Sequence, residues 1–184
     1  MKRLFAALIF ILLAAPAVAQ DFDKGLAAYN SGDYATALRE MRPLAEQGSA
    51  TAQFGLGNMY LEGHGVPQDY AEAAKWYRLA AEQGHADAQF SLGLMYANDE
   101  GVPRNDKEAL KWLRLAADQG SGTAQFILGM RYAIGEGVPQ DFVLAYMWLN
   151  LGGASPPSVV YLMTPSDISM AQRMAREWLE AHPQ

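Results

Sequence analysis

Residues 50–76 read ATAQFGLGNMYLEGHGVPQDYAEAAKW, and a closely related stretch follows twice along the 184-residue chain. The glycine-rich loop inside it raises a choice between a phosphate-binding loop and a turn. Its Gly-Val-Pro triplet recurs every 36 residues, at 65–67, 101–103 and 137–139. A period between 20 and 50 residues is typical of repeat architectures, so the loop is interpreted as a connector that returns with each repeat.

The three copies agree far beyond the loop. Aligned segments share 13 identical columns out of 36; the segments are 48–83, 84–119 and 120–155. Each copy predicts two helices, the first over about 49–62 with Ser49 as its cap. Glycine and proline end that helix, and a second begins at Asp69. Gly57 recurs in the middle of the first helix, which indicates close approach of a neighbouring helix.

The second helices carry recognisable start signals. Asp69 with Glu72, and Asn105 with Glu108, have the spacing of a capping box. No strand is predicted before the loop, and the Gly-x-x-x-x-Gly-Lys-[Ser/Thr] pattern is absent, so a phosphate site is excluded. The tryptophans of the second helices recur on an apolar stripe and are predicted to be core: Trp76, Trp112 and Trp148.

The flanks of the repeats are interpreted separately. Residues 20–48 resemble a shortened helix pair that lacks the Gly-Val-Pro insert. Pro156-Pro157 stops any helix, so 154–163 is predicted to be a linker, with room for a short turn. Thr164-Pro165-Ser166-Asp167 then predicts the start of a last helix within 164–184, which would cover the open end of the repeats.

The N-terminus has the pattern of an export signal. Lys2 and Arg3 precede an apolar run up to Ala15, which is shorter than the roughly 20 residues of a membrane-spanning helix. The small residues at 17–19 then predict a signal peptide over 1–19, cleaved after Ala19. An uncleaved membrane anchor is the alternative. We expect export to a Gram-negative periplasm, with no stable membrane anchor after cleavage.

Composition excludes several classes of partner. Without Lys2 and Arg3 the chain keeps 12 of its 14 basic residues against 20 acidic ones, a formal charge of −8. The absence of any basic cluster argues against nucleic acid as a partner. There are no cysteines, so packing alone holds the fold and no thiol nucleophile exists. We expect a monomer without cofactor or metal.

The unit A-x-A-Q-F-x-L-G-x-M-Y-x-x-G-x-G-V-P-x-D-x-x-x-A-x-x-W, seen at Ala50 to Trp76, resembles the Sel1-like repeat, a relative of the tetratricopeptide repeat. The resemblance covers about 49–151, with a diverged unit before it. Two departures concern local loop structure: Asp99 stands where Gly63 and Gly135 do, and Arg131 stands where Met59 and Met95 do.

The resemblance implies an all-α fold, a right-handed superhelical solenoid of antiparallel helix pairs with a C-terminal capping helix. It divides the chain into the following parts: signal peptide 1–19, divergent pair 20–48, repeats 49–84, 85–120 and 121–153, linker 154–163, and capping helix 164–184. Such solenoids serve as scaffolds or adaptors that bind a protein or an extended peptide on their concave face.

The same resemblance implies which residues line the concave face. They are Thr51, Phe54 and Asn58, then Asp87, Phe90 and Leu94, then Thr123, Phe126 and Met130. The three phenylalanines fit either a groove floor or packing between helices. Variation among Asn58, Leu94 and Met130 fits a binding groove as well as it fits unconstrained surface.

Catalysis is not predicted. His64, His85 and His182 lie in loops or near the chain end without an evident partner, and His85 with Asp87 falls short of the three ligands that a metal needs. Some exported relatives rich in disulfides are reported to act on penicillins or peptidoglycan. Two alternatives stay open: an envelope protein that acts on peptidoglycan or a β-lactam, using Asp87 or Glu62, and a periplasmic inhibitor of a sensor kinase.

Overall fold

The computed structural model describes the backbone of residues 15–154 and 157–183, and the side chains of 22–154 and 159–183. These residues form helices joined by turns and loops, with no strand. The helices are α1 (Ala15–Asn30), α2 (Tyr34–Glu46), α3 (Ala50–Glu62), α4 (Tyr70–Glu82), α5 (Ala86–Asn98), α6 (Asp106–Asp118), α7 (Gly122–Ile134), α8 (Phe142–Leu151), α9 (Pro157–Val160) and α10 (Pro165–Ala181).

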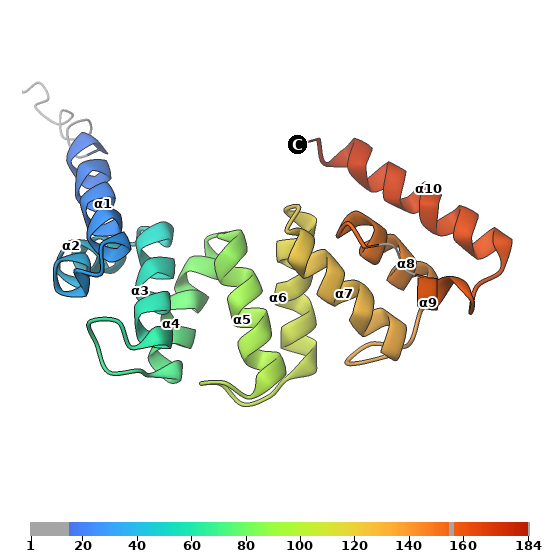
Figure 1. Ribbon diagram of the computed structural model, residues 1–184, viewed down its shortest axis with the longest axis horizontal. Helices are drawn as coiled ribbons and strands as arrows, with labels where there is room; N and C mark the ends of the chain where they lie inside the picture. The colour runs from blue at the N-terminus through green and yellow to red at the C-terminus, as the bar shows by residue number, and fades with distance from the viewer. Residues whose placement is uncertain (1–14, 155–156, 184) are drawn as a thin grey trace, which may run out of the picture.

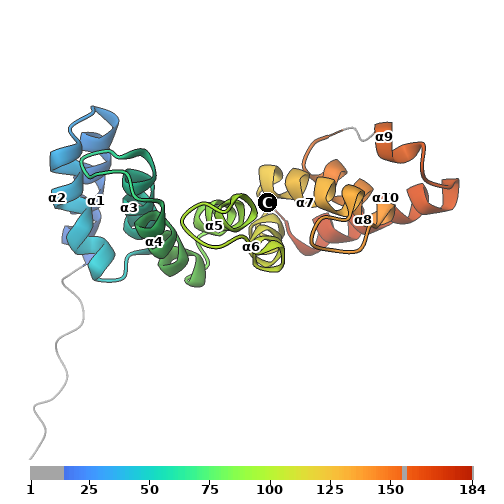
Figure 2. The ribbon, with the colours of Figure 1, turned by 90° about the horizontal axis from the view of Figure 1, so that it is seen from below.

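The helices follow one another as pairs along the long axis of the molecule (Figure 1). Each helix from α1 to α8 packs against the next one in sequence, and α10 packs against α8. Seen from below, the pairs form a single row that ends in α10 (Figure 2). The predicted all-α repeat solenoid is therefore confirmed.

Three predictions concern the ends of the chain: the signal peptide, the linker and the capping helix. Most of the predicted signal peptide lies outside the described residues; residues 15–19 begin α1. Its cleavage after Ala19 stays a prediction. The predicted linker contains one short helix, α9, and α10 begins behind Thr164 with a complete capping box to Asp167.

The N-caps explain where most helices begin, and they correct one prediction. The Asp69 carboxylate accepts from the N–H groups of Ala71 and Glu72, and the Asn105 side chain does the same in α6. The reciprocal half of each predicted capping box is wrong. The Asp69 N–H donates to the Tyr60 carbonyl at 2.9 Å instead, because the loop folds back onto the helix before it. Glu72 pairs with Lys75.

The Gly-Val-Pro loop joins the two helices of a repeat and contacts the unit before it. Gly101 has φ of 67°, a left-handed conformation that favours glycine, and a Cβ on it would overlap the Tyr70 carbonyl. Gly65 approaches Tyr34 in the same way, with a Cβ position 2.9 Å from its carbonyl oxygen. The loop therefore rests on the first turn of the second helix of the preceding unit, which answers the choice between turn and phosphate site.

The glycine in the middle of each first helix permits close packing, as predicted. A Cβ on Gly57 would overlap the Tyr77 ring. On Gly93 it would lie 2.9 Å from Leu113 Cγ, and on Gly129 it would lie 3.0 Å from the Ala145 carbonyl oxygen. The two helices of each repeat consequently approach at a point where no side chain separates them.

Buried glutamines tie each repeat to the one before it. The Gln53 amide donates to the Ala45 carbonyl at 3.0 Å, near the end of α2. Its counterparts Gln89 and Gln125 donate at 3.1 and 3.0 Å to the carbonyls at the same place in α4 and α6. These glutamines are at most 4% exposed, and each adds a side-chain donor to a carbonyl in the last turn of a helix, which also accepts from the backbone N–H of the glycine after that helix at 3.0 Å.

The buried core consists of clusters that follow one another along the repeats. Trp112 and Trp148 are buried, as predicted, whereas Trp76 is half-buried at the edge of the first core cluster. At the far end α10 covers α8: Ala171 and Ala175 are buried, and Trp178 meets Trp148 edge to face with ring centroids 6.0 Å apart. The last helix therefore closes the solenoid.

Candidate functional site

A pocket of about 270 Å³ lies where the first helices of neighbouring units meet; we call it the N-terminal pocket. Four of the predicted site residues line it together: Thr51, Phe54 and Asn58 of α3, and Asp87 of α5. They belong to two different repeats. The structure therefore brings these four side chains to one place.

The floor of the N-terminal pocket is apolar and comes from three helices. It is lined by Phe22 and Leu26 of α1, Met41 of α2, and Phe54 and Gly55 of α3. Leu26 is 41% exposed, so an apolar surface remains open to water at the rim. Such exposed apolar surface around a concave site is typical of a binding site.

The polar groups of the N-terminal pocket are held in place by their neighbours. The Tyr77 hydroxyl donates to Asn58 Oδ1 at 2.6 Å, which leaves the Asn58 NH₂ group for a ligand. Burial raises the pKa of Tyr77, so the phenol remains a donor at neutral pH. His85 caps α5 by accepting from the Ala88 N–H at Nδ1, and its ring stacks on Phe54 with centroids 4.8 Å apart.

Asp87 gives the N-terminal pocket its charge. It is exposed in the first turn of α5, and it is the only carboxylate among the described side chains that line the pocket. No lysine or arginine is among those side chains. The pocket therefore combines an apolar floor with one negative charge at the rim.

The other five predicted residues lie along the continuation of the same helices. Phe90 is half-buried and packs against the core of the third repeat, and Leu94 is half-buried as well. Thr123 is exposed, and Phe126 and Met130 are 42% and 43% exposed. None of the five lines the N-terminal pocket. Of the equivalent phenylalanines, Phe90 thus packs against the core, whereas Phe126 lies at the surface.

Sequence reasoning missed six residues of the N-terminal pocket: Phe22, Leu26, Tyr29, Met41, Gly55 and His85. Phe22, Leu26 and Tyr29 follow the i, i+4, i+7 spacing of one helical face, which is the signal that could have found them. His85 falls in the column of Ser49 and Ser121, all three being N-caps, and this register could have revealed its capping role.

Beside the N-terminal pocket, the first loop is anchored by a polar and aromatic cluster. The Tyr29 hydroxyl donates to Glu62 Oε2 at 2.6 Å, and His64 Nδ1 lies 2.8 Å from the same oxygen. The His64 ring stacks on Tyr34 with centroids 4.1 Å apart. Burial and the bond to Glu62 raise the pKa of Tyr29, so Tyr29 acts as a donor and not as a nucleophile.

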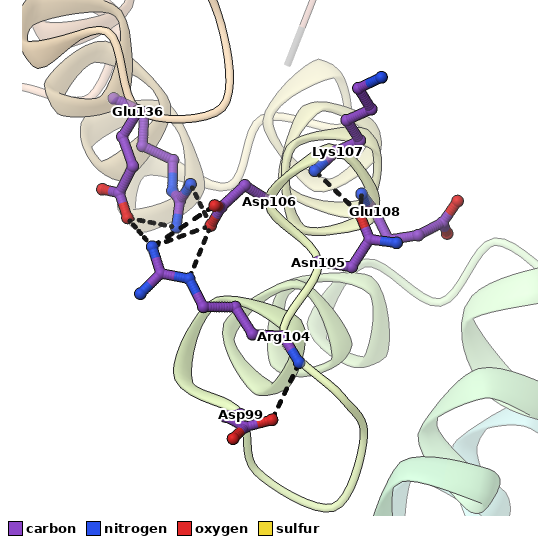
Figure 3. Close-up of polar contacts among 8 residues, drawn as sticks. Asp99, Arg104, Asn105, Asp106, Lys107, Glu108 and Glu136 are labelled. Carbon is purple, nitrogen blue, oxygen red and sulfur yellow. Dashed lines mark hydrogen bonds and ion pairs between the residues drawn. The ribbon is translucent and has the colours of Figure 1, made fainter.

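The third loop is anchored by ion pairs instead. Arg104, Asp106 and Glu136 point toward one another (Figure 3), with Arg104 Nη2 3.0 Å from Glu136 Oε1. Arg131, only 5% exposed, joins them at 3.7 Å from Asp106 and 3.5 Å from Glu136. These ion pairs explain why residue 131 is an arginine, although the first two repeats have methionine at the equivalent position.

The described residues lack two kinds of feature. Within residues 15–154 and 157–183, no helix is long and apolar enough to cross a membrane. In the same part of the chain, no group of three or more histidine or acidic residues could hold a metal ion.

A row of helix pairs with matching caps, loops and glutamine ties defines the chain as an α-helical repeat protein. The family model described as the Sel1 repeat matches residues 50–85, 86–121 and 122–154, more than half of the chain. The protein therefore belongs to the Sel1 repeat family. Sel1 repeats generally mediate protein–protein interactions, and proteins built from them are typically non-enzymatic scaffolds.

Solved structures agree with this assignment. The chain is 38% identical to a protective antigen of uropathogenic Escherichia coli strains that displays an SLR fold, with a TM-score of 0.72, over 76% of this chain and 31% of that one. It is 33% identical to a Sel1 repeat protein from Oxalobacter formigenes, with a TM-score of 0.69, over 72% of this chain and 54% of that one. No curated protein matches.

Proposed function

We propose that the protein is an exported scaffold or adaptor that binds a protein or an extended peptide along the face formed by α3, α5 and α7. The observation that supports it most directly is a row of apolar side chains left open to water on α7. Phe126, Met130 and Ile134 are spaced four residues apart and are 42%, 43% and 63% exposed. Contiguous exposed apolar surface on a folded protein is typical of an interaction site.

The first repeat extends this binding face with a different chemistry. Its columns hold Phe54, Asn58 and Glu62 where the third repeat has Phe126, Met130 and Ile134. A partner that runs along the face therefore meets polar and acidic groups at one end and apolar groups at the other. An extended chain can satisfy both ends at once, because it spans several repeats.

Export to the periplasm is part of the proposal and rests on the N-terminal sequence. Lys2, Arg3, the apolar run after them and the small residues at 17–19 are its support. Fractionation of cells that express the full chain, with N-terminal sequencing of the product, tests it. We expect a periplasmic product that begins at Gln20; a cytoplasmic product that retains Met1 would contradict export.

Photo-crosslinking in cells tests the binding face. A photoreactive residue is placed at Asn58, Leu94 or Met130, with Lys111 on α6 as the matched control on the other helix row. We expect discrete adducts from the first three positions and none from Lys111. Equal adducts at Lys111, or none at any position in folded and exported protein, would contradict the proposal.

The alternative of an envelope protein acting on peptidoglycan or a β-lactam has one observation in its favour: Asp87 and His85 line the same pocket. Turnover of either substrate by the purified protein, lost on Asp87→Asn, would favour that activity over a scaffold role. Inhibition of a sensor kinase would be a case of the scaffold proposal, with the kinase as the crosslinked partner.

A further inference from the structure

We propose that the N-terminal pocket holds one large apolar side chain of a peptide. The residue next to it in the peptide is lysine or arginine, and Asp87 forms an ion pair with that basic side chain. The inference rests on the proposed function and names the kind of partner residue that the first repeat selects. Its evidence is the size of the pocket, the composition of its floor and the carboxylate at its rim, which has no ion-pair partner among the described side chains.

The size of the pocket favours a side chain over a whole small molecule. At about 270 Å³ it lies just below the range of roughly 300–1,000 Å³ that is typical of small-molecule sites. Its floor consists of Phe22, Leu26, Met41 and Phe54, none of which offers a hydrogen bond through its side chain. A leucine, methionine or phenylalanine side chain is thus the matching occupant.

The pocket exists because the first repeat has a glycine where the other repeats have larger residues. Gly55 corresponds to Ser91 in the second repeat and to Ile127 in the third. A Cβ on Gly55 would lie 3.2 Å from Met41 Sδ, so any larger side chain would extend into the space between α3 and the first helix pair. At this column the first repeat therefore leaves room that the serine of the second repeat and the isoleucine of the third would occupy.

The negative charge at the rim of the pocket favours a basic residue next to the apolar side chain of the peptide. Asp87 is the only carboxylate among the described lining side chains, and no lysine or arginine accompanies it. The formal charge of −8 without Lys2 and Arg3 adds a long-range attraction for cations. The Nδ1 atom of His85 is engaged with the backbone of α5, where it accepts from the Ala88 N–H.

The test uses the full chain, purified after expression in a bacterium, on an array of immobilised octapeptides. Each peptide has a Gly-Ser frame, and its two central positions run through all pairs of amino acids. We expect the strongest signals where leucine, methionine, phenylalanine or tryptophan stands next to lysine or arginine. Dissociation constants of the strongest pairs are then measured by fluorescence anisotropy at low and at high salt.

Two substitutions connect the signal to the N-terminal pocket. Gly55→Ile fills the pocket with the residue that the third repeat carries at this column, and we expect it to weaken binding by about tenfold or more. Gly122→Ile is the matched control, since it makes the same change at the start of α7, where a Cβ would meet nothing within 4 Å, and it should leave binding unchanged. If Gly55→Ile lowers the melting temperature markedly, Gly55→Ser replaces it and should weaken binding to a smaller extent.

Asp87→Asn should weaken binding of the best peptides by about two- to fivefold, remove the preference for lysine or arginine over glutamine, and reduce the salt dependence. Glu82→Gln, an equal change of charge at the end of α4, should do none of these. An array without the expected pairs, or a signal that survives pocket filling, overturns the inference. Crosslinks at Asn58 and Leu94 together with a blank array would overturn this inference alone and leave the proposed function standing.

Discussion

Met59 in the first repeat and Arg131 in the third occupy the same column, yet they anchor their loops by opposite chemistry. Met59 is completely buried in an apolar cluster, and the loop that follows is held by His64 stacked on Tyr34. Arg131 is as deeply placed, but its guanidinium pairs with Asp106 and Glu136. The loop backbone is the same in both, since Gly65 and Gly137 have φ of 74° and 73°. The repeat therefore specifies the backbone geometry of the loop, whereas the side-chain contacts that hold it differ from one unit to another.

The largest expected difference between the two repeats lies in their tryptophans. Trp148 is completely buried beneath α10, so Trp148→Ala should lower the free energy of unfolding by about 3–5 kcal/mol. Trp76 is half-buried, and Trp76→Ala should cost about 1.5–2.5 kcal/mol. Urea denaturation followed by circular dichroism measures both. Equal losses would mean that α10 does not protect the third repeat.

The ion pairs of the third loop give the next effect. Removing both carboxylates with Asp106→Ala and Glu136→Ala leaves the buried Arg131 charge uncompensated and should cost about 2–4 kcal/mol. Adding Arg131→Met, which restores the residue of the first two repeats, should recover most of that loss. A triple variant as unstable as the double one would show that the carboxylates stabilise the loop independently of Arg131.

Replacing the left-handed glycine by alanine in the first and third loops should test whether the two loops share one backbone geometry. Gly65→Ala and Gly137→Ala each force a side chain into a left-handed conformation and against the preceding helix, at a cost of about 1–3 kcal/mol. Because the backbone is the same, the two losses should agree within about 1 kcal/mol. Thermal unfolding of the paired variants checks this, and a clearly unequal pair would contradict a common loop geometry.

The smallest effect concerns helix caps at the two ends of the chain. Hydrogen bonds from Thr36 and from Thr164 hold the pKa values of Asp33 and Asp167 below their ordinary range. A carboxyl whose pKa is lowered by folding contributes stability at higher pH, and this contribution is lost as the pH falls through the folded pKa. NMR titration should show both shifts. Thr164→Ala should return Asp167 toward its ordinary pKa and leave Asp33 unchanged.

The fold could be predicted because its signals are local and repeated. The Gly-Val-Pro spacing, the caps at Ser49 and Asp69 and the glycine at 57 each state a backbone requirement within a few residues. The prediction of complete capping boxes at Asp69 and Asn105 was wrong because of a contact outside the helix. The Asp69 N–H already donates to the Tyr60 carbonyl across the loop. Spacing alone does not reveal that competition.

The candidate site was less predictable because it depends on contacts between units. Thr51, Phe54, Asn58 and Asp87 follow from the repeat register, but three residues of the pocket floor come from α1 and α2, which lack the full repeat pattern: Phe22, Leu26 and Met41. His85 became part of the site by stacking on Phe54, 31 positions earlier in the chain. The burial of Arg131 likewise required partners on α6 and in the next loop.

The glutamine ties have a consequence for the mechanical behaviour of the molecule. Gln83 also donates to Gln53 within the first repeat at 2.7 Å, and Gln119 to Gln89 within the second at 2.7 Å, so neutral hydrogen bonds join the two helices of a repeat as well as each repeat to the unit before it. Neutral amides do not titrate, and buried ones are not screened by salt. The joints between repeats should therefore keep the same stiffness across a wide range of acidity and ionic strength. The spacing of the repeats that a partner contacts should therefore stay constant, even under conditions where the ion pairs on the loops break.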